Sequence, residues 1–127
     1  MRALIIDDSK TMRVILRRIL TDLGFEVAEA GDGQQALTVM ETGPLPELCL
    51  IDWNMPVMDG YTFVTRVRDV PEWRDVTLMM VTTESSHGNI VRALAAGAHE
   101  YVIKPFTPDA IQEKLELLGL VKDGAAA

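Results

Sequence analysis

Five polar side chains stand directly after short apolar runs of the sequence. Asp7 and Asp8 follow the first run, and Asp52 follows a later one. Thr82 and Lys104 each follow one more. Three carboxylates that lie close together repel one another strongly unless a cation or protons intervene. Mg²⁺ suits such a cluster, because it prefers oxygen ligands and keeps waters that phosphate oxygens can replace.

Phosphoryl transfer to an aspartate is the chemistry that this set favours. A carboxylate such as Asp52 can act as a covalent nucleophile and become an aspartyl-phosphate. The phosphoryl oxygens carry charge that Mg²⁺, the Lys104 ammonium and the Thr82 hydroxyl can each neutralise or bond. Taken singly, an acidic pair, a threonine or a Lys-Pro after a strand has a plainer interpretation as a helix start, a cap or a turn. Their joint occurrence at four strand ends favours the chemical interpretation.

The apolar runs themselves predict the strands of a parallel sheet. Four runs are continuously apolar, and we expect them to be buried on both faces, as a sheet covered by helices requires. They are Ala3–Ile6, Leu48–Ile51, Leu78–Val81 and Tyr101–Ile103. The fifth run, Phe25–Ala28, alternates between apolar and polar residues and predicts a more exposed strand near an edge.

Helices are predicted in the gaps, from apolar residues at helical spacing together with capping residues. Ser9 can cap the first helix and Gly24 can end it. The other four helices begin near positions 33, 60, 87 and 108. The helix that begins near 87 is predicted to run to 96. This alternation predicts one doubly wound α/β domain over residues 1–121, followed by a frayed tail at 122–127. In such a sheet the site lies beyond the carboxyl ends of the strands, where the five polar residues meet.

Composition narrows the class of protein. The 127 residues are 48% apolar and 24% charged, as in an ordinary folded domain. The net charge of −7 makes nucleic acid an unfavourable partner. We find no apolar run of the length that a membrane helix needs, and the single cysteine, Cys49, cannot form an internal disulfide. We therefore expect a cytoplasmic protein that is not inserted in a membrane.

Several segments carry a resemblance to a known family. They are Ile6-Asp7-Asp8-Ser9, Asp52-Trp53-Asn54-Met55-Pro56, Met58-Asp59-Gly60, Val81-Thr82, Gly97-Ala98 and Tyr101 followed by Lys104-Pro105-Phe106. In this order, and over essentially the whole chain, they resemble the receiver domains of two-component response regulators, most closely the stand-alone chemotaxis regulators. The resemblance implies a flavodoxin-like, five-stranded parallel sheet in the order 2-1-3-4-5 with five helices. That strand order is typical of this family. We take it from the resemblance, because the apolar runs alone do not determine it.

The resemblance also implies the roles of the acidic residues. Asp52 matches the phosphoacceptor, which takes its phosphoryl group from a histidine kinase or the kinase's phosphotransfer domain. Asp7, Asp8 and Asp52 match the metal site, in which Asp8 and Asp52 bind Mg²⁺ and Asp7 acts mainly through a water, with Mn²⁺ as an alternative ion. Asn54 matches the position whose backbone carbonyl completes the metal site.

Further matches concern the switch. Thr82 and Lys104 match the hydroxyl and the lysine that bind the phosphoryl oxygens, and Tyr101 matches an aromatic residue that turns inward on activation. The bond between Lys104 and Pro105 matches a cis peptide. Asn54 and Glu84 match positions that tune autodephosphorylation, which is the protein's only expected hydrolytic activity.

Two surfaces are expected to meet partners. By resemblance, a downstream protein binds the face made by the fourth helix, the fifth strand and the fifth helix, where the expected contacts are Ile90, Tyr101, Ile103 and Lys114. The arginines of the first helix, Arg13, Arg17 and Arg18, suit either a solvated face or a docking face for the kinase. We expect the protein to be a monomer.

Alternative functions remain at this point. A receiver of this kind can serve as a phosphate sink or a relay intermediate instead of binding a motor. A phosphatase with an aspartate nucleophile would need a second aspartate where Asn54 stands. A flavodoxin-like cofactor binder would need a phosphate-cradling loop where Asp7 and Asp8 stand. A degenerate receiver acting as a scaffold would not keep the full acidic set.

Overall fold

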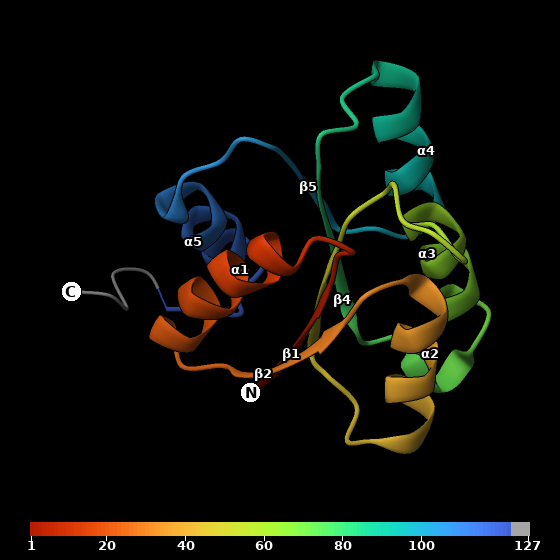
Figure 1. Cartoon of the computed structure of the whole chain (residues 1–127), viewed down its shortest axis with the longest axis horizontal. Helices are drawn as coiled ribbons and strands as arrows, with labels where there is room; N and C mark the ends of the chain where they lie inside the picture. Colours follow the sequence, from red (N-terminus) through yellow and green to blue (C-terminus); the bar gives the residue numbers. More distant parts are fainter. Residues whose placement is uncertain (123–127) are drawn as a thin grey trace.

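The computed structural model describes residues 1–122, which form a parallel sheet between two layers of helices (Figure 1). The strand order is β2-β1-β3-β4-β5, as the resemblance implied. The strands are β1 (Arg2–Ile6), β2 (Glu26–Ala30), β3 (Leu48–Ile51), β4 (Thr77–Thr82) and β5 (Glu100–Ile103). The helices are α1 (Lys10–Asp22), α2 (Gly33–Thr42), α3 (Gly60–Arg68), α4 (His87–Ala96), α5 (Pro108–Leu117) and the short 3₁₀ helix η1 (Pro71–Trp73). Within residues 1–122, none of these helices has the length and apolarity needed to cross a bilayer.

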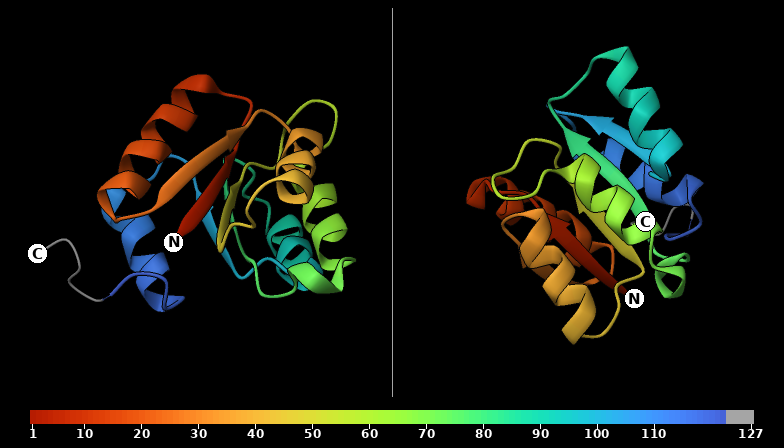
Figure 2. Two further views of the ribbon diagram at one scale, coloured as in Figure 1. Left: turned by 90° about the horizontal axis from the view of Figure 1, so that it is seen from below. Right: turned by 90° about the vertical axis from the view of Figure 1, so that its right-hand side faces the viewer.

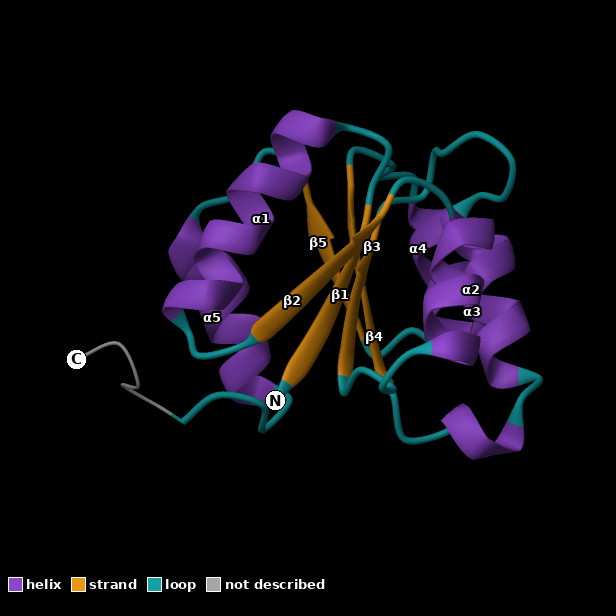
Figure 3. Cartoon of the chain, turned by 60° about the horizontal axis from the view of Figure 1, so that its bottom comes forward, coloured by secondary structure: helices purple, strands orange, loops and turns teal. Residues whose placement is uncertain are grey.

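The helices cover the two faces of the sheet unequally. Helices α1 and α5 lie on one face, and α2, α3 and α4 lie on the other (Figures 2 and 3). Successive strand residues point to opposite faces, so Ile5 packs with the α1 and α5 residues while Leu4 and Ile6 pack with those of α2 and α3. The continuous burial predicted for the first three apolar runs is confirmed in β1, β3 and β4.

The edge strands are β2 and β5, and only β2 was predicted to lie near an edge from its apolar pattern. The alternating run was expected near an edge, and β2 is an edge strand, although it begins after the buried Phe25. The prediction that Tyr101–Ile103 is buried on both faces is wrong, because β5 is the other edge strand and Ile103 is 43% exposed. An apolar run does not reveal which strand lacks a second neighbour.

The predicted helix ends are confirmed. The Ser9 hydroxyl accepts a hydrogen bond from the Met12 N–H at the start of α1, and Gly24 follows its end with φ of 95°. Helix α4 has the predicted bounds and ends at Gly97, whose φ of 124° suits glycine. The predicted tail at 122–127 lies outside the described residues apart from Lys122.

Arg68, at the end of α3, joins the two backbone segments that precede β4 and β5, at the amino ends of these strands. Its guanidinium donates hydrogen bonds to the carbonyls of Gly97 and Val76, at 3.0 Å each. Beside it, His99 Nδ1 accepts a hydrogen bond of 3.1 Å from the Leu78 N–H, which fixes Nδ1 as the unprotonated nitrogen. Burial, and then the positive charge of Arg68, lower the pKa of His99.

Candidate functional site

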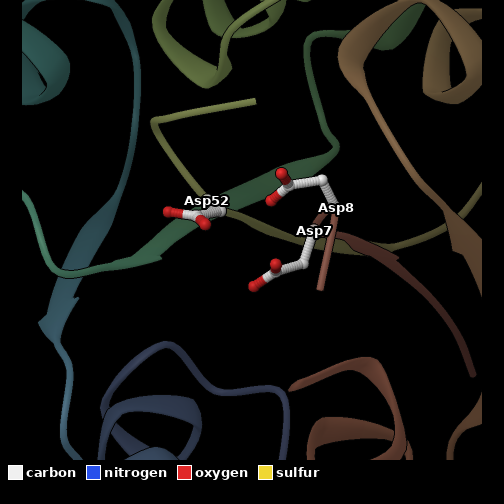
Figure 4. A group of neighbouring side chains, drawn as sticks. All are labelled: Asp7, Asp8 and Asp52. Atoms are coloured by element: carbon white, nitrogen blue, oxygen red, sulfur yellow. The ribbon is translucent and has the colours of Figure 1, made fainter. Parts of the chain in front are cut away.

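The three predicted aspartates meet at the carboxyl ends of the adjacent strands β1 and β3. Backbone pairing continues one residue past β1 and β3, since the Asp7 N–H donates to Ala30 and the Asp52 N–H donates to Ile6. One carboxylate oxygen from each of Asp7, Asp8 and Asp52 lies within 4.8 Å of the others (Figure 4). Asp7 and Asp52 are buried while Asp8 is exposed, so the cluster opens to solvent on one side.

Lys104 reaches into the same cluster from the loop after β5. Its ammonium nitrogen lies 2.8 Å from Asp7 Oδ2 and 3.4 Å from Asp52 Oδ2. The expected cis peptide between Lys104 and Pro105 is confirmed. One ammonium offsets only one of three formal negative charges here, so the residues fit a cation that prefers oxygen ligands, as Mg²⁺ does.

The loop that carries Asp52 packs tightly against the start of α3. A side chain at Gly60 would place its Cβ 2.1 Å from the Asp52 carbonyl oxygen, so only glycine fits there. The Gly60 N–H donates to the Trp53 carbonyl at 2.8 Å, and the Trp53 N–H donates to Asp52 Oδ1 at 2.8 Å. Asn54 lies in the same loop and is exposed. The sequence predicted Gly60 as a helix start, but it gave no sign of this close contact with the nucleophile.

Thr82, Glu84 and Tyr101 form a second group beside the cluster. Thr82 is fully buried at the end of β4, and its hydroxyl accepts a hydrogen bond of 3.2 Å from the Glu84 N–H. The Tyr101 side chain is buried, 9% exposed, with its hydroxyl donating to the Glu84 carbonyl. Burial and the negative charges of Glu84 and Asp52 raise the pKa of Tyr101 to about 12. Thr83, the residue after Thr82, is exposed.

The expected output residues lie at different depths. Ile103 is exposed, whereas Ile90 is half-buried against the core and Tyr101 is buried. The Lys114 ammonium pairs with the Glu100 carboxylate at 3.3 Å. Two α4 residues that were not singled out from the sequence, Val91 and Leu94, are 50% and 42% exposed and add apolar surface to the same part of the molecule.

The arginines of α1 are engaged within the chain more than the sequence suggested. Arg13 and Arg17 both bind the Glu29 carboxylate of β2, at 2.9 and 2.6 Å. Burial alone would raise the pKa of Glu29, but these two arginines lower it. Arg13 also donates to the backbone carbonyl of Asp7 at 2.7 Å, so it supports the acidic pair. Arg18 is exposed.

Comparison with known proteins agrees with this geometry. Residues 3–116 match the family model described as the response regulator receiver domain. The chemotaxis protein CheY1 of Helicobacter pylori is 39% identical over 119 residues, which are 93% of this chain and 96% of that protein. The chemotaxis protein CheY of Pseudomonas aeruginosa is 41% identical over 117 residues, which are 91% of this chain and 94% of that protein.

Solved structures show the same fold. The chemotaxis protein CheY4 of Vibrio cholerae has a TM-score of 0.84 at 34% identity, covering 91% of this chain and 96% of that one. The receiver domain of a sensor histidine kinase of Pseudomonas aeruginosa, solved with a magnesium ion coordinated in its active site cleft, has a TM-score of 0.82 at 28% identity, covering 91% of this chain and 94% of that one. Receiver domains are signalling switches rather than conventional enzymes, and they bind Mg²⁺ in an acidic pocket. This chain belongs to the response regulator receiver family, and the two curated relatives named above are chemotaxis proteins.

Proposed function

We propose that a histidine kinase or its phosphotransfer domain phosphorylates this chain on Asp52, and that the phosphorylated form binds a downstream protein of the chemotaxis or motility type. The observation that carries the proposal is the convergence of Asp7, Asp8 and Asp52 within 4.8 Å, with the Lys104 ammonium between two of them. Neither a helix start nor a turn requires carboxylates and an ammonium group from three separate strand ends to meet.

The reaction follows from the position of Asp52. A carboxylate oxygen attacks the phosphorus of a phosphohistidine, the new P–O bond forms as the P–N bond breaks, and the electron pair stays on the imidazole nitrogen. Lys104 is close enough to Asp52, at 3.4 Å, to pair with a phosphoryl oxygen attached there. The buried Thr82 hydroxyl is free to donate, because in its bond with Glu84 it accepts.

The metal would be held by side-chain oxygens of Asp8 and Asp52 and by the backbone carbonyl of Asn54, with Asp7 acting mainly through a water. When bound, Mg²⁺, or Mn²⁺ in its place, would neutralise charge on the phosphoryl oxygens. The exposure of Asp8 supports this assignment, since Mg²⁺ usually keeps several waters. Hydrolysis of the aspartyl-phosphate by water then resets the switch, at a rate that Asn54 and Glu84 tune.

The output surface would be the face of α4, β5 and α5, with Ile90, Tyr101, Ile103 and Lys114 as contacts. The exposed apolar side chains of Val91 and Leu94, which are neighbours on α4, and of Ile103 on β5 support this assignment, because exposed apolar patches mark protein-binding sites. Tyr101 connects this face to the site through the Glu84 carbonyl. We further propose that the receiver domain spans residues 1–121, acts as a monomer and works in the cytoplasm.

Phosphorylation by a small donor tests the assignment. Incubation with acetyl phosphate and Mg²⁺ should add one phosphoryl group by intact-mass analysis, and Asp52→Asn should abolish the addition. Asp75→Asn is the matched control, because Asp75 is exposed and lies outside the cluster. Equal labelling of Asp52→Asn and the parent would refute Asp52 as the acceptor. Transfer from purified histidine kinases then identifies the physiological donor.

A further inference from the structure

Three side chains from different elements form a stack that starts beside Asp52 and ends on α4. The rings of Trp53 and Tyr61 are stacked, with centroids 5.5 Å apart and planes inclined by 19°. The Arg92 guanidinium carbon lies 4.6 Å from the centroid of the Tyr61 ring, in the geometry of a cation–π contact. Trp53 lies in the loop after β3, Tyr61 is the second residue of α3, and Arg92 lies on α4.

The inner end of the stack is fixed to the nucleophile through the backbone. The Trp53 N–H donates to Asp52 Oδ1 at 2.8 Å, and the Trp53 carbonyl accepts from the Gly60 N–H, also at 2.8 Å. Gly60 in turn packs against the Asp52 carbonyl and precedes Tyr61 in α3. A change at the Asp52 carboxylate therefore acts first on the residue whose ring begins the stack.

The outer end of the stack is fixed to α4. Arg92 Nη1 donates to Asn89 Oδ1 at 3.0 Å, less than one turn earlier in the helix. Ser86 and, to a lesser degree, Asn89 lower the pKa of the Glu84 side chain. The Glu84 backbone carbonyl accepts a hydrogen bond from the Tyr101 hydroxyl. Arg92 therefore stands where the stack meets the group of residues around the Tyr101 hydroxyl.

We propose that Tyr61 and Arg92 are positioning residues that transmit the state of Asp52 to helix α4. The inference rests on the proposed phosphorylation of Asp52. In the unmodified chain the Trp53 N–H donates to a carboxylate oxygen, which is a charge-assisted bond. Once Asp52 carries a phosphoryl group its acyl group is neutral, whichever oxygen forms the new bond, so that hydrogen bond weakens. Trp53 is then free to shift against Tyr61, and Arg92 responds with α4.

The strength of the cation–π contact between Arg92 and Tyr61 suits this role. A cation–π contact at an exposed site changes an equilibrium by about two- to fivefold. That is enough to bias two positions of a helix without locking either of them, which is what a population shift requires. Arg92 is exposed, so replacing it removes the contact without opening a cavity in the core.

The experiment uses beryllofluoride with Mg²⁺ as a stable mimic of the phosphoryl group, read by backbone amide NMR. The Lys104 amide reports on the site, and the amides of Val91 and Leu94 report on α4. In the parent both groups of resonances should shift. In Arg92→Gln and in Tyr61→Leu the Lys104 shift should persist, while the equilibrium constant for the α4 response falls by about two- to fivefold.

Control variants separate the stack from general effects. Tyr61→Phe keeps the ring and should behave like the parent. Arg66→Gln removes an exposed arginine of α3 that lies outside the stack, and it should also behave like the parent. The double variant of Arg92→Gln with Tyr61→Leu should lose no more than Tyr61→Leu alone, since that variant already removes the ring that Arg92 contacts.

The experiment distinguishes failure of the inference about Tyr61 and Arg92 from failure of the proposed phosphorylation of Asp52. An α4 response of parental size in both Arg92→Gln and Tyr61→Leu, with the Lys104 shift intact, would overturn the inference and leave the proposed function standing. Additive losses in the double variant would also overturn it, because the two residues would then act separately. Absence of any response to beryllofluoride in the parent, at Lys104 and on α4 alike, would refute the proposed function itself.

Discussion

Replacing Gly60 by alanine should damage both the stability and the chemistry of the chain. The new Cβ would lie 2.1 Å from the Asp52 carbonyl oxygen and 2.9 Å from its carbonyl carbon, distances that no side-chain rotation can relieve. The backbone of α3 or of Asp52 must therefore move. Overpacking against well-packed atoms costs about 1–3 kcal/mol, and a contact with backbone belongs at the upper end, at about 3 kcal/mol. In a domain of this size that loss lowers Tm by roughly 10 °C.

The same displacement should slow phosphorylation. Asp52 would be moved relative to Lys104 and the other carboxylates, and misplacement of a reacting group by about 1 Å can cost about 100-fold in rate. Urea unfolding gives the change in the free energy of unfolding, and intact-mass analysis with acetyl phosphate gives the rate.

Gly88→Ala is the matched control for this substitution. Gly88 also lies in the first turn of a helix, α4, but a Cβ there meets no atom within 4 Å in the described structure. Alanine should therefore stabilise the chain by about 0.5–1 kcal/mol through its better helix propensity. A harmless surface substitution changes the free energy of unfolding by no more than about 0.5 kcal/mol. If Gly60→Ala changes it by no more than this, the contact with Asp52 does not have the effect argued above.

Two other perturbations test the metal site and the other end of the sheet, where His99 precedes β5. Mg²⁺ should change the fluorescence of Trp53, measured in a Trp73→Phe background, and Asp8→Ala should remove most of that change; a full response in Asp8→Ala would place the ion elsewhere. His99 has a pKa below its ordinary value of 6.5, so the unfolded chain binds this proton more tightly and the folded chain loses stability as pH falls below about 6.5. Urea unfolding at about pH 7.5 and pH 5.5 should show a smaller loss in His99→Gln than in the parent, and equal losses would contradict the structural role of Nδ1.

The elements and the convergence of the site were predictable because both depend on local patterns. A continuous apolar run indicates a strand covered on two faces, and parallel strands bring their carboxyl ends to one edge of the sheet. Asp7, Asp52 and Lys104 were therefore expected at one end of the sheet once the strands were identified, and the strand order taken from the resemblance brought them closer together. The exposed Ile103 was mispredicted because its run looks like a central strand, and only the strand order shows that β5 has one neighbour.

The contacts around the site were not predictable, because they join helices whose relative rotation is a property of the whole fold. Arg13 and Arg17 have the spacing of a solvated helix face, and nothing near them in the sequence indicates that Glu29 lies opposite. Arg92 likewise has no local sign of the Tyr61 ring beneath it. Val57 adopts φ of 68°, a region that β-branched residues avoid, so local propensity argues against the conformation observed.

The packing of α4 gives these polar contacts their influence. Its single fully buried residue is Ala93, a small side chain, whereas α3 buries Phe63, Val64 and Val67 in addition to Gly60. A helix that buries little apolar area is held weakly by the core, and such elements open or shift at low cost. Besides the partly buried Ile90 and Ala96, the position of α4 then depends on Arg92 over Tyr61 and on the hydrogen bond between the Ser86 N–H and Glu84 at its start. Both sets of contacts lead back to the neighbours of Asp52, so the helix that the core holds least is the one best placed to respond to it.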